Sequence, residues 1–190
     1  MNHTPYRTAS HLAAFSLLVC LSTVSILTPV RAAKDPESQE TLNGGYYLLH
    51  KVCEDETNLP LLIMVKHTPQ DITDYMNRIA KTAKESAGDI ERLHESDASL
   101  QFERNPLPLI ECDVRESIHD DKQHQLLFGT TNSEFVRALL VSQIESSTYA
   151  LNLAKVLAEQ EKDQDRVKTL QHMSAKWLTI RNEAFRLLRN

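Results

Sequence analysis

Apolar side chains recur at steps of three and four residues along most of the second half of this chain. That spacing places them on one side of an α-helix, where a neighbouring helix can bury them. The 190 residues include only 4 glycines, and nothing in them resembles a sheet of three or more strands. The chain is therefore predicted to be all-α, a helical bundle of about four amphipathic helices.

The predicted helices have clear start and stop signals. Thr68 and Pro69 fit an N-cap followed by the first helical residue. Thr131 and Glu134 have the spacing of a capping box, which begins another helix just after a stop at Gly129. The four predicted helices span about 69–96, about 109–128, from Thr131 into the charged stretch 159–165, and about 165–188.

The region before these helices is harder to assign. Residues 33–45 are polar and end in Asn43-Gly44-Gly45, which predicts a flexible leader with a turn. Residues 46–66 form a short ambiguous element. Its Tyr46, Leu49 and Cys53 fit one helical face, but a strand fits nearly as well. Residues 46–190 are predicted to form one domain.

The first 32 residues have the three parts of a secretory signal peptide. Arg7 lies before an uncharged apolar run, 12–27, and Val30-Arg31-Ala32 follows as a cleavage site. The run is shorter than the roughly 20 residues that span a bilayer. We expect an exported protein, periplasmic or extracellular, with no membrane insertion after cleavage. An uncleaved N-terminal membrane anchor is the alternative.

The charge of the chain after this segment excludes two classes of partner. Residues 33–190 carry 19 basic and 26 acidic side chains, a net charge of −7 with histidine neutral. Nucleic-acid binding needs a basic surface, and so does attachment to anionic lipid. The expected partner is therefore an envelope protein or a small molecule.

Two cysteines, Cys53 and Cys112, follow the signal segment. An oxidising compartment would allow them to form a disulfide, whereas free cysteines are often small buried core residues. Their spacing contains no CxxC redox motif, and the sequence leaves both alternatives open.

Two Glu-x-x-His segments are the most suggestive chemical pattern: Glu91 with His94, and Glu116 with His119. At this spacing both side chains lie on one face of a helix and could ligate the same metal ion. Carboxylate-bridged di-iron bundles of the ferritin-like type use two such pairs with further glutamates, and Glu111 is available here. The pattern predicts a divalent-metal site.

The apolar pattern of 109–128 argues against that site. Ile110, Val114 and Ile118 mark its apolar stripe, which we expect to face the core. Glu116 and His119 then point toward solvent, where charged residues are common. Solvated helix faces are the simpler interpretation.

Several polar residues lie on or beside apolar stripes, among them Gln143, Ser146 and Arg181. Buried polar groups need partners. Arg181 could pair across the bundle with Glu111 or Asp121, and the alternative is a small polar pocket that binds a ligand.

No motif for nucleophilic catalysis occurs in the sequence. We therefore expect an exported, non-enzymatic bundle with a binding, interaction or structural role in the cell envelope. A metal-binding bundle is the first alternative, and a small hydrolase is the second. An interaction protein should expose an apolar patch. A hydrolase needs a cleft with a titratable group of shifted pKa.

Overall fold

A computed structural model of the chain describes residues 36–61, 66, 68–102, 104–128 and 131–189. It confirms the all-α prediction, and the described residues contain no strand. The predicted signal segment and Gly129 lie outside the described residues. The five helices are α1 (Pro36–Thr57), α3 (Gln70–Ser96), α4 (Leu109–Phe128), α5 (Asn132–Gln160) and α6 (Gln164–Leu188).

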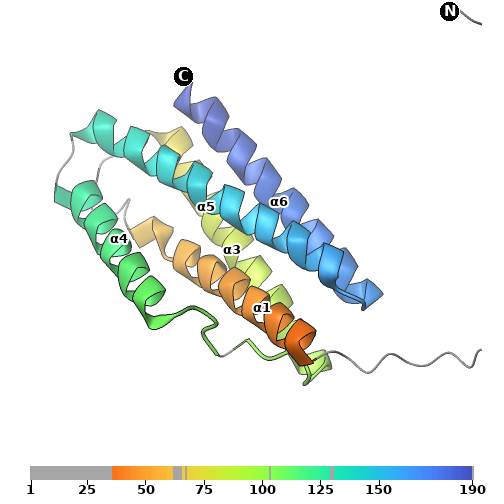
Figure 1. Cartoon of the computed structure of the whole chain (residues 1–190). Coiled ribbons are helices and arrows are strands. Elements are labelled where there is room, and N and C mark those ends of the chain that lie inside the picture. Colours follow the sequence, from red (N-terminus) through yellow and green to blue (C-terminus); the bar gives the residue numbers. More distant parts are fainter. Residues whose placement is uncertain (1–35, 62–65, 67, 103, 129–130, 190) are drawn as a thin grey trace, which may run out of the picture. The chain divides into compact units, whose positions relative to one another are not determined.

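Four of these helices form a closed bundle (Figure 1). α1 packs against α3 and α5, and α6 packs against the same two helices. Each helix in this ring runs antiparallel to both of its neighbours, so α3 and α5 run in the same direction at opposite corners. The chain needs a return connection between them, and residues 97–108 together with α4 supply it. α4 lies on the outside of the bundle and packs on α5.

The boundary predicted between the leader and the ambiguous element is wrong, because α1 begins at Pro36 within the first and ends at Thr57 within the second. Gly44 and Gly45 lie inside this helix, where they permit close packing and make no turn. A Cβ on Gly44 would lie 2.8 Å from the Cβ of Pro106, and one on Gly45 would lie 2.5 Å from Cδ2 of Leu157. The glycines bring α1 close to α5 and to the connection after α3.

The later boundaries agree with the sequence, with one correction at the start of α3. Pro69 occupies the N-cap position there, and Thr68 instead hydrogen-bonds through its hydroxyl to that of Thr73 at 2.9 Å. The capping box of α5 is confirmed, because Thr131 N and Oγ1 both contact Oε2 of Glu134.

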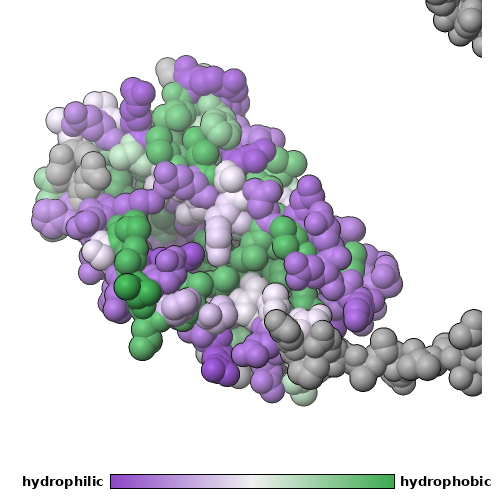
Figure 2. All heavy atoms as spheres, in the orientation of Figure 1, coloured by the Kyte–Doolittle hydropathy of each residue, from purple (hydrophilic) through white to green (hydrophobic). Residues whose placement is uncertain are grey.

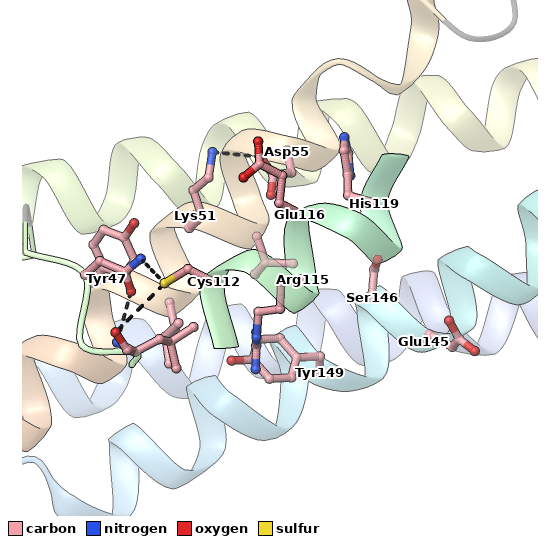
Figure 3. A pocket seen from close by; sticks show the side chains of 14 residues that line it. Tyr47, Lys51, Asp55, Cys112, Arg115, Glu116, His119, Glu145, Ser146 and Tyr149 are labelled. Atoms are coloured by element: carbon pink, nitrogen blue, oxygen red, sulfur yellow. Dashed lines mark hydrogen bonds and ion pairs between the residues drawn. The ribbon is translucent and has the colours of Figure 1, made fainter. Parts of the chain in front are cut away.

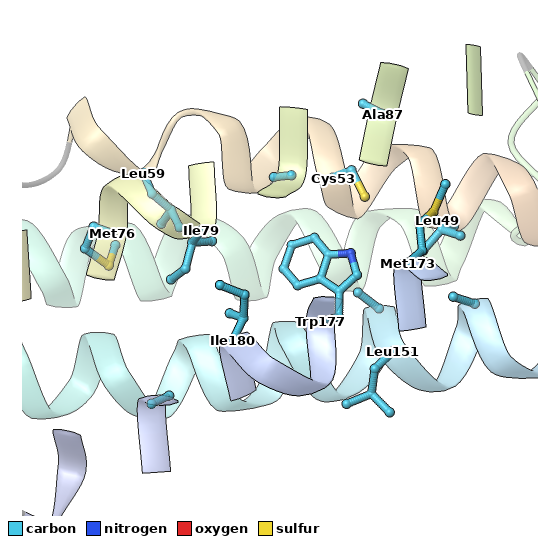
Figure 4. Packing of buried hydrophobic residues seen from close by; sticks show 14 of the residues in the cluster. Leu49, Cys53, Leu59, Met76, Ile79, Ala87, Leu151, Met173, Trp177 and Ile180 are labelled. Carbon is cyan, nitrogen blue, oxygen red and sulfur yellow. The ribbon is translucent and has the colours of Figure 1, made fainter. Parts of the chain in front are cut away.

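The core is built around Trp177, which is fully buried on α6 (Figure 4). Cys53 of α1, Ile79 of α3 and Leu151 of α5 are also buried in this cluster. Burial raises the pKa of the Cys53 thiol to about 12, although the neighbouring Ser86 and Trp177 side chains oppose the shift. Cys53 is therefore a protonated core residue at neutral pH.

A buried polar junction joins all four bundle helices at one end. Glu161, which caps the C-terminus of α5, accepts a hydrogen bond from Tyr46 of α1 at 3.1 Å. Arg166 of α6 pairs with Glu161 at 3.0 Å and with Asp97, the C-cap of α3, at 3.0 Å. The Arg166 and Glu161 side chains are 9% and 2% exposed. The stretch 159–165 was predicted as the last turn of this helix, whereas α5 ends at Gln160 and Glu161 is buried at its C-cap.

The buried junction predicts that removing the positive charge of Arg166 strongly destabilises the protein. Arg166→Met leaves Glu161 buried without its counter-charge, and it should lower the free energy of unfolding by about 3–5 kcal/mol. Lys168→Met is the matched control, because Lys168 pairs with Asp165 at an exposed position and should leave stability nearly unchanged. Urea denaturation measures both variants, and a similar small change in the two would contradict the role of the junction.

Gly45 and Gly88 both lie in helices but have different surroundings, so substitution by alanine should change stability in opposite directions. At Gly45 the overpacking against buried Leu157 should outweigh the gain in helix propensity, for a net loss of roughly 1 kcal/mol. At Gly88 the nearest neighbour is the Arg92 guanidinium at 3.4 Å, so Gly88→Ala should stabilise the protein by up to about 1 kcal/mol. Thermal denaturation of both variants tests this, and stabilisation at both positions would show that Gly45 is not needed for packing.

Candidate functional site

α4 presents its apolar stripe to solvent. Ile110, Val114 and Ile118, which were expected to face the core, are 75%, 47% and 49% exposed. Leu126 of the same helix is buried, at the position where α4 reaches the bundle. The prediction of an inward stripe is wrong because the helix is rotated, with its more polar side toward the bundle.

Beneath α4 lies a pocket of about 640 Å³ between α1, α4 and α5 (Figure 3). Tyr47, Leu48 and Val52 of α1 line one side, and Tyr149 lies on the α5 side. Glu116 and His119 are exposed, as predicted, and they also line the α4 side of this pocket. The volume falls within the range of small-molecule sites in proteins.

The basic side chains around the pocket are already paired. Lys51 lies 2.9 Å from Asp55, and Lys122 of α4 lies 2.7 Å from Glu145. Arg115 lies 2.8 Å from Glu111 and also contacts the face of the Tyr149 ring, 5.9 Å from its centroid. This pairing of Glu111 replaces the predicted pair with Arg181.

Behind the pocket wall, a buried carboxyl lies between α1 and α5. Glu56 is 7% exposed and Gln143 is 2% exposed. Oε2 of Glu56 and Oε1 of Gln143 have no hydrogen-bond partner among the described residues. Ser146 lines the pocket and interacts with the Glu56 carboxyl, so it connects the two features.

The environment of Glu56 favours its neutral form. Burial raises the pKa of this carboxyl to about 7, while hydrogen bonding from Ser146 and Gln143 opposes the shift. The adjacent Asp55 raises the pKa further, and the charge of Lys122 lowers it. Glu56 therefore changes its protonation state close to neutral pH.

The structure does not bring the two Glu-x-x-His pairs together. Glu91 lies 3.2 Å from Nε2 of His50 on α1. His94 contacts the Leu100 carbonyl and meets the Phe102 ring edge to face. Glu116 and His119 lie on a different side of the bundle, at the pocket below α4. Within the part of the chain that the structure describes, no three His, Cys, Asp or Glu side chains form a group that could hold a metal ion.

The two cysteines are unpaired. Cys53 is buried in the core, and Cys112 lies at the pocket wall, where Nδ2 of Asn105 approaches its sulfur at 3.1 Å (Figure 3). The disulfide alternative is therefore not realised in this structure.

Sequence reasoning missed Glu56, although a signal for it was present. Tyr46, Leu49 and Cys53 were recognised as one helical face, and Glu56 is the next position on that face. A carboxyl that continues an apolar stripe is a candidate buried acid. The ambiguity between helix and strand hid this pattern.

Comparisons of the chain with protein-family models, with curated proteins and with solved structures found no match in any of the three. Among the described helices, none is long and apolar enough to cross a membrane.

The buried carboxyl predicts a specific dependence of stability on pH. Because folding raises the pKa of Glu56 from 4.5 to about 7, the folded protein retains a proton that the unfolded chain releases between these values. The free energy of unfolding should fall by about 3 kcal/mol as pH rises through this window. Glu56→Gln should lack this decrease and should be more stable than the wild type at pH 8.

The measurement is urea denaturation of both proteins from pH 4 to pH 8, compared as a difference. Glu95→Gln, at an exposed position on α3, is the matched control and should follow the wild type. A constant difference between wild type and Glu56→Gln across this range would contradict the buried, titrating carboxyl.

Proposed function

We propose that this protein is an exported interaction protein whose α4 binds a partner through its outer face. The partner that fits this face is a basic amphipathic helix of another protein. The observation that carries the proposal is the orientation of α4, with its apolar stripe toward solvent and its polar side toward the bundle. An amphipathic helix that packs only within its own domain has the opposite orientation.

The exposed apolar residues form a continuous row. Ile110, Val114 and Ile118 are one turn apart, and Leu109 and Phe128 at the two ends of α4 are 83% and 76% exposed. Figure 2 shows apolar side chains gathered along this helix. Scattered apolar side chains are ordinary on a protein surface, but a contiguous row along one helix is typical of an interaction site.

Charge selects a basic partner. Asp113 and Asp120 flank the row on one side, and Asp121 lies within it. None of these three aspartates makes an ion pair with another described residue. A helix with lysine or arginine beside its apolar stripe would neutralise them and would also bury the row.

Two other occupants of this face have poorer charge complementarity. A second copy of the chain, packed α4 on α4, would place the same aspartates near one another. The N-terminal apolar run 12–27 of this chain has no charged residue to offer them. A basic segment of another protein satisfies both the apolar and the charged features.

Export is the second part of the proposal, and it is supported by the N-terminal sequence. The order of Arg7, the apolar run 12–27 and the small residue Ala32 is typical of a cleaved signal peptide. We expect the protein in the periplasm or outside the cell, where it would meet its partner.

The test uses two synthetic helical peptides that share leucines at spacings of three and four residues. One carries lysine at its other positions and the second carries glutamate. The lysine peptide should bind the purified protein and the glutamate peptide should not. Ile118→Ser should weaken binding about tenfold, which is 1.4 kcal/mol. Calorimetry gives the affinities.

Leu178→Ser is the matched control, because Leu178 is 40% exposed on α6 away from this face. This substitution should leave the affinity unchanged. Asp120→Lys should weaken binding of the lysine peptide and strengthen binding of the glutamate peptide. Equal binding of both peptides, or a loss in Leu178→Ser equal to that in Ile118→Ser, would contradict the proposal. A dimer that Ile118→Ser dissociates would identify a second copy as the occupant instead.

A further inference from the structure

The pocket below α4 has a chemistry that the proposed partner-binding face does not use. It lies on the opposite side of α4 from the exposed row, and it is lined by side chains from three helices. Two of its wall residues are aromatic, Tyr47 and Tyr149. Aromatic faces and carboxylates together are suited to organic cations.

The unpaired charge at the pocket is acidic. Each lysine and arginine there has a carboxylate partner, as the Lys51 pair with Asp55 and the Lys122 pair with Glu145 show. Glu116 lines the pocket and makes no ion pair with any described residue. An anion entering the pocket would meet this carboxylate and would have no free cation to bind.

Two buried oxygen atoms behind the wall have no hydrogen-bond donor among the described residues. The free atoms of Glu56 and Gln143 are both oxygen acceptors, from α1 and α5. Unpartnered buried acceptors are destabilising unless a donor reaches them. Ser146 interacts with Glu56 from the pocket side, so a donor that displaces or joins its hydroxyl would reach these oxygens from the pocket.

We infer that this pocket binds a small organic cation with N–H donors, such as an aliphatic amine, whose charged head meets Glu56 and Gln143. The head supplies the donors that both oxygens lack. The carbon chain lies against Val52 and the two tyrosine rings, and Glu116 of α4 provides a second carboxylate for a ligand with two cationic ends. A bound cation would thereby connect α4 to α1 and α5.

The test uses three molecules that share a four-carbon chain and differ in charge: 1,4-diaminobutane, neutral 1,4-butanediol and the dianion succinate. Binding to the full chain at pH 8 is followed by shifts of backbone amide resonances in NMR spectra. The diamine should bind saturably, with a dissociation constant on the order of millimolar or tighter. It should shift the amides of Glu56, Gln143 and Ser146, whereas the diol and succinate should not.

Glu56→Gln should weaken binding of the diamine at least tenfold. The protein should remain folded, because the substitution removes a buried charge. Glu91→Gln, on α3 and outside the pocket, should bind as the wild type does. Protons compete with the cation for Glu56, so wild-type affinity should fall about tenfold from pH 8 to pH 6. The other charged or titratable groups near Glu56 are Asp55, Lys122 and Tyr75, and the pocket wall adds His119. All of them are retained in Glu56→Gln. The difference in pH dependence between the two proteins therefore measures the contribution of Glu56 alone.

No saturable binding of the diamine would overturn the inference, and so would unchanged binding in Glu56→Gln or equal shifts with the diol. These outcomes leave the peptide test of the outer α4 face unaffected, because the pocket and that face involve different side chains.

Discussion

The buried junction of Tyr46, Asp97, Glu161 and Arg166 determines how the four bundle helices meet. It is the one described place where side chains or caps from α1, α3, α5 and α6 lie in a single hydrogen-bonded network. Two helices end there and two begin near it, so one arginine satisfies the carboxylates at two C-terminal caps. A buried ion pair of this kind adds little net stability, but loss of either partner leaves an uncompensated buried charge. This junction is compatible with the antiparallel ring, in which α3 and α5 end at the same end of the bundle.

The ring has a consequence for α4. α3 and α5 run in the same direction. The chain that connects the end of α3 to the start of α5 must therefore run back along the outside of the bundle. The four other helices enclose the core around Trp177, and Leu126 is the one described side chain that α4 contributes to it. Its apolar stripe therefore remains exposed, and the polar side chains that it turns inward enclose a pocket and leave it unfilled. The exposed apolar row and the pocket thus lie on two sides of the same helix.

Much of the fold was predictable from local pattern. The apolar spacing and the capping box at Thr131 were sufficient to place α3, α5 and α6 within a few residues. Periodicity could not show that Gly44 and Gly45 belong to a helix, because the reason is tertiary contact with Pro106 and Leu157. Local composition favours a turn at such a pair, and packing overrides it.

The site was less predictable, and the reason is the orientation of one helix. A stripe shows which residues share a face, but it does not show whether that face meets the core or a partner. The assumption that Ile110, Val114 and Ile118 face inward was wrong, and it left the pocket beside Glu116 and His119 unpredicted, although both residues are exposed as expected. The Glu-x-x-His pattern drew attention to residues that the fold separates, while the buried acid Glu56 carried no motif.

The central claim is that the apolar side of α4 faces solvent in the folded protein. Paramagnetic broadening of methyl resonances by a soluble nitroxide measures this directly, because it falls steeply with distance from solvent. Strong broadening is expected for the methyl groups of Ile110, Val114 and Ile118, and little for those of buried Leu139. Protection of the α4 methyl groups to the level of Leu139 would contradict it, since these residues would then be packed within the protein.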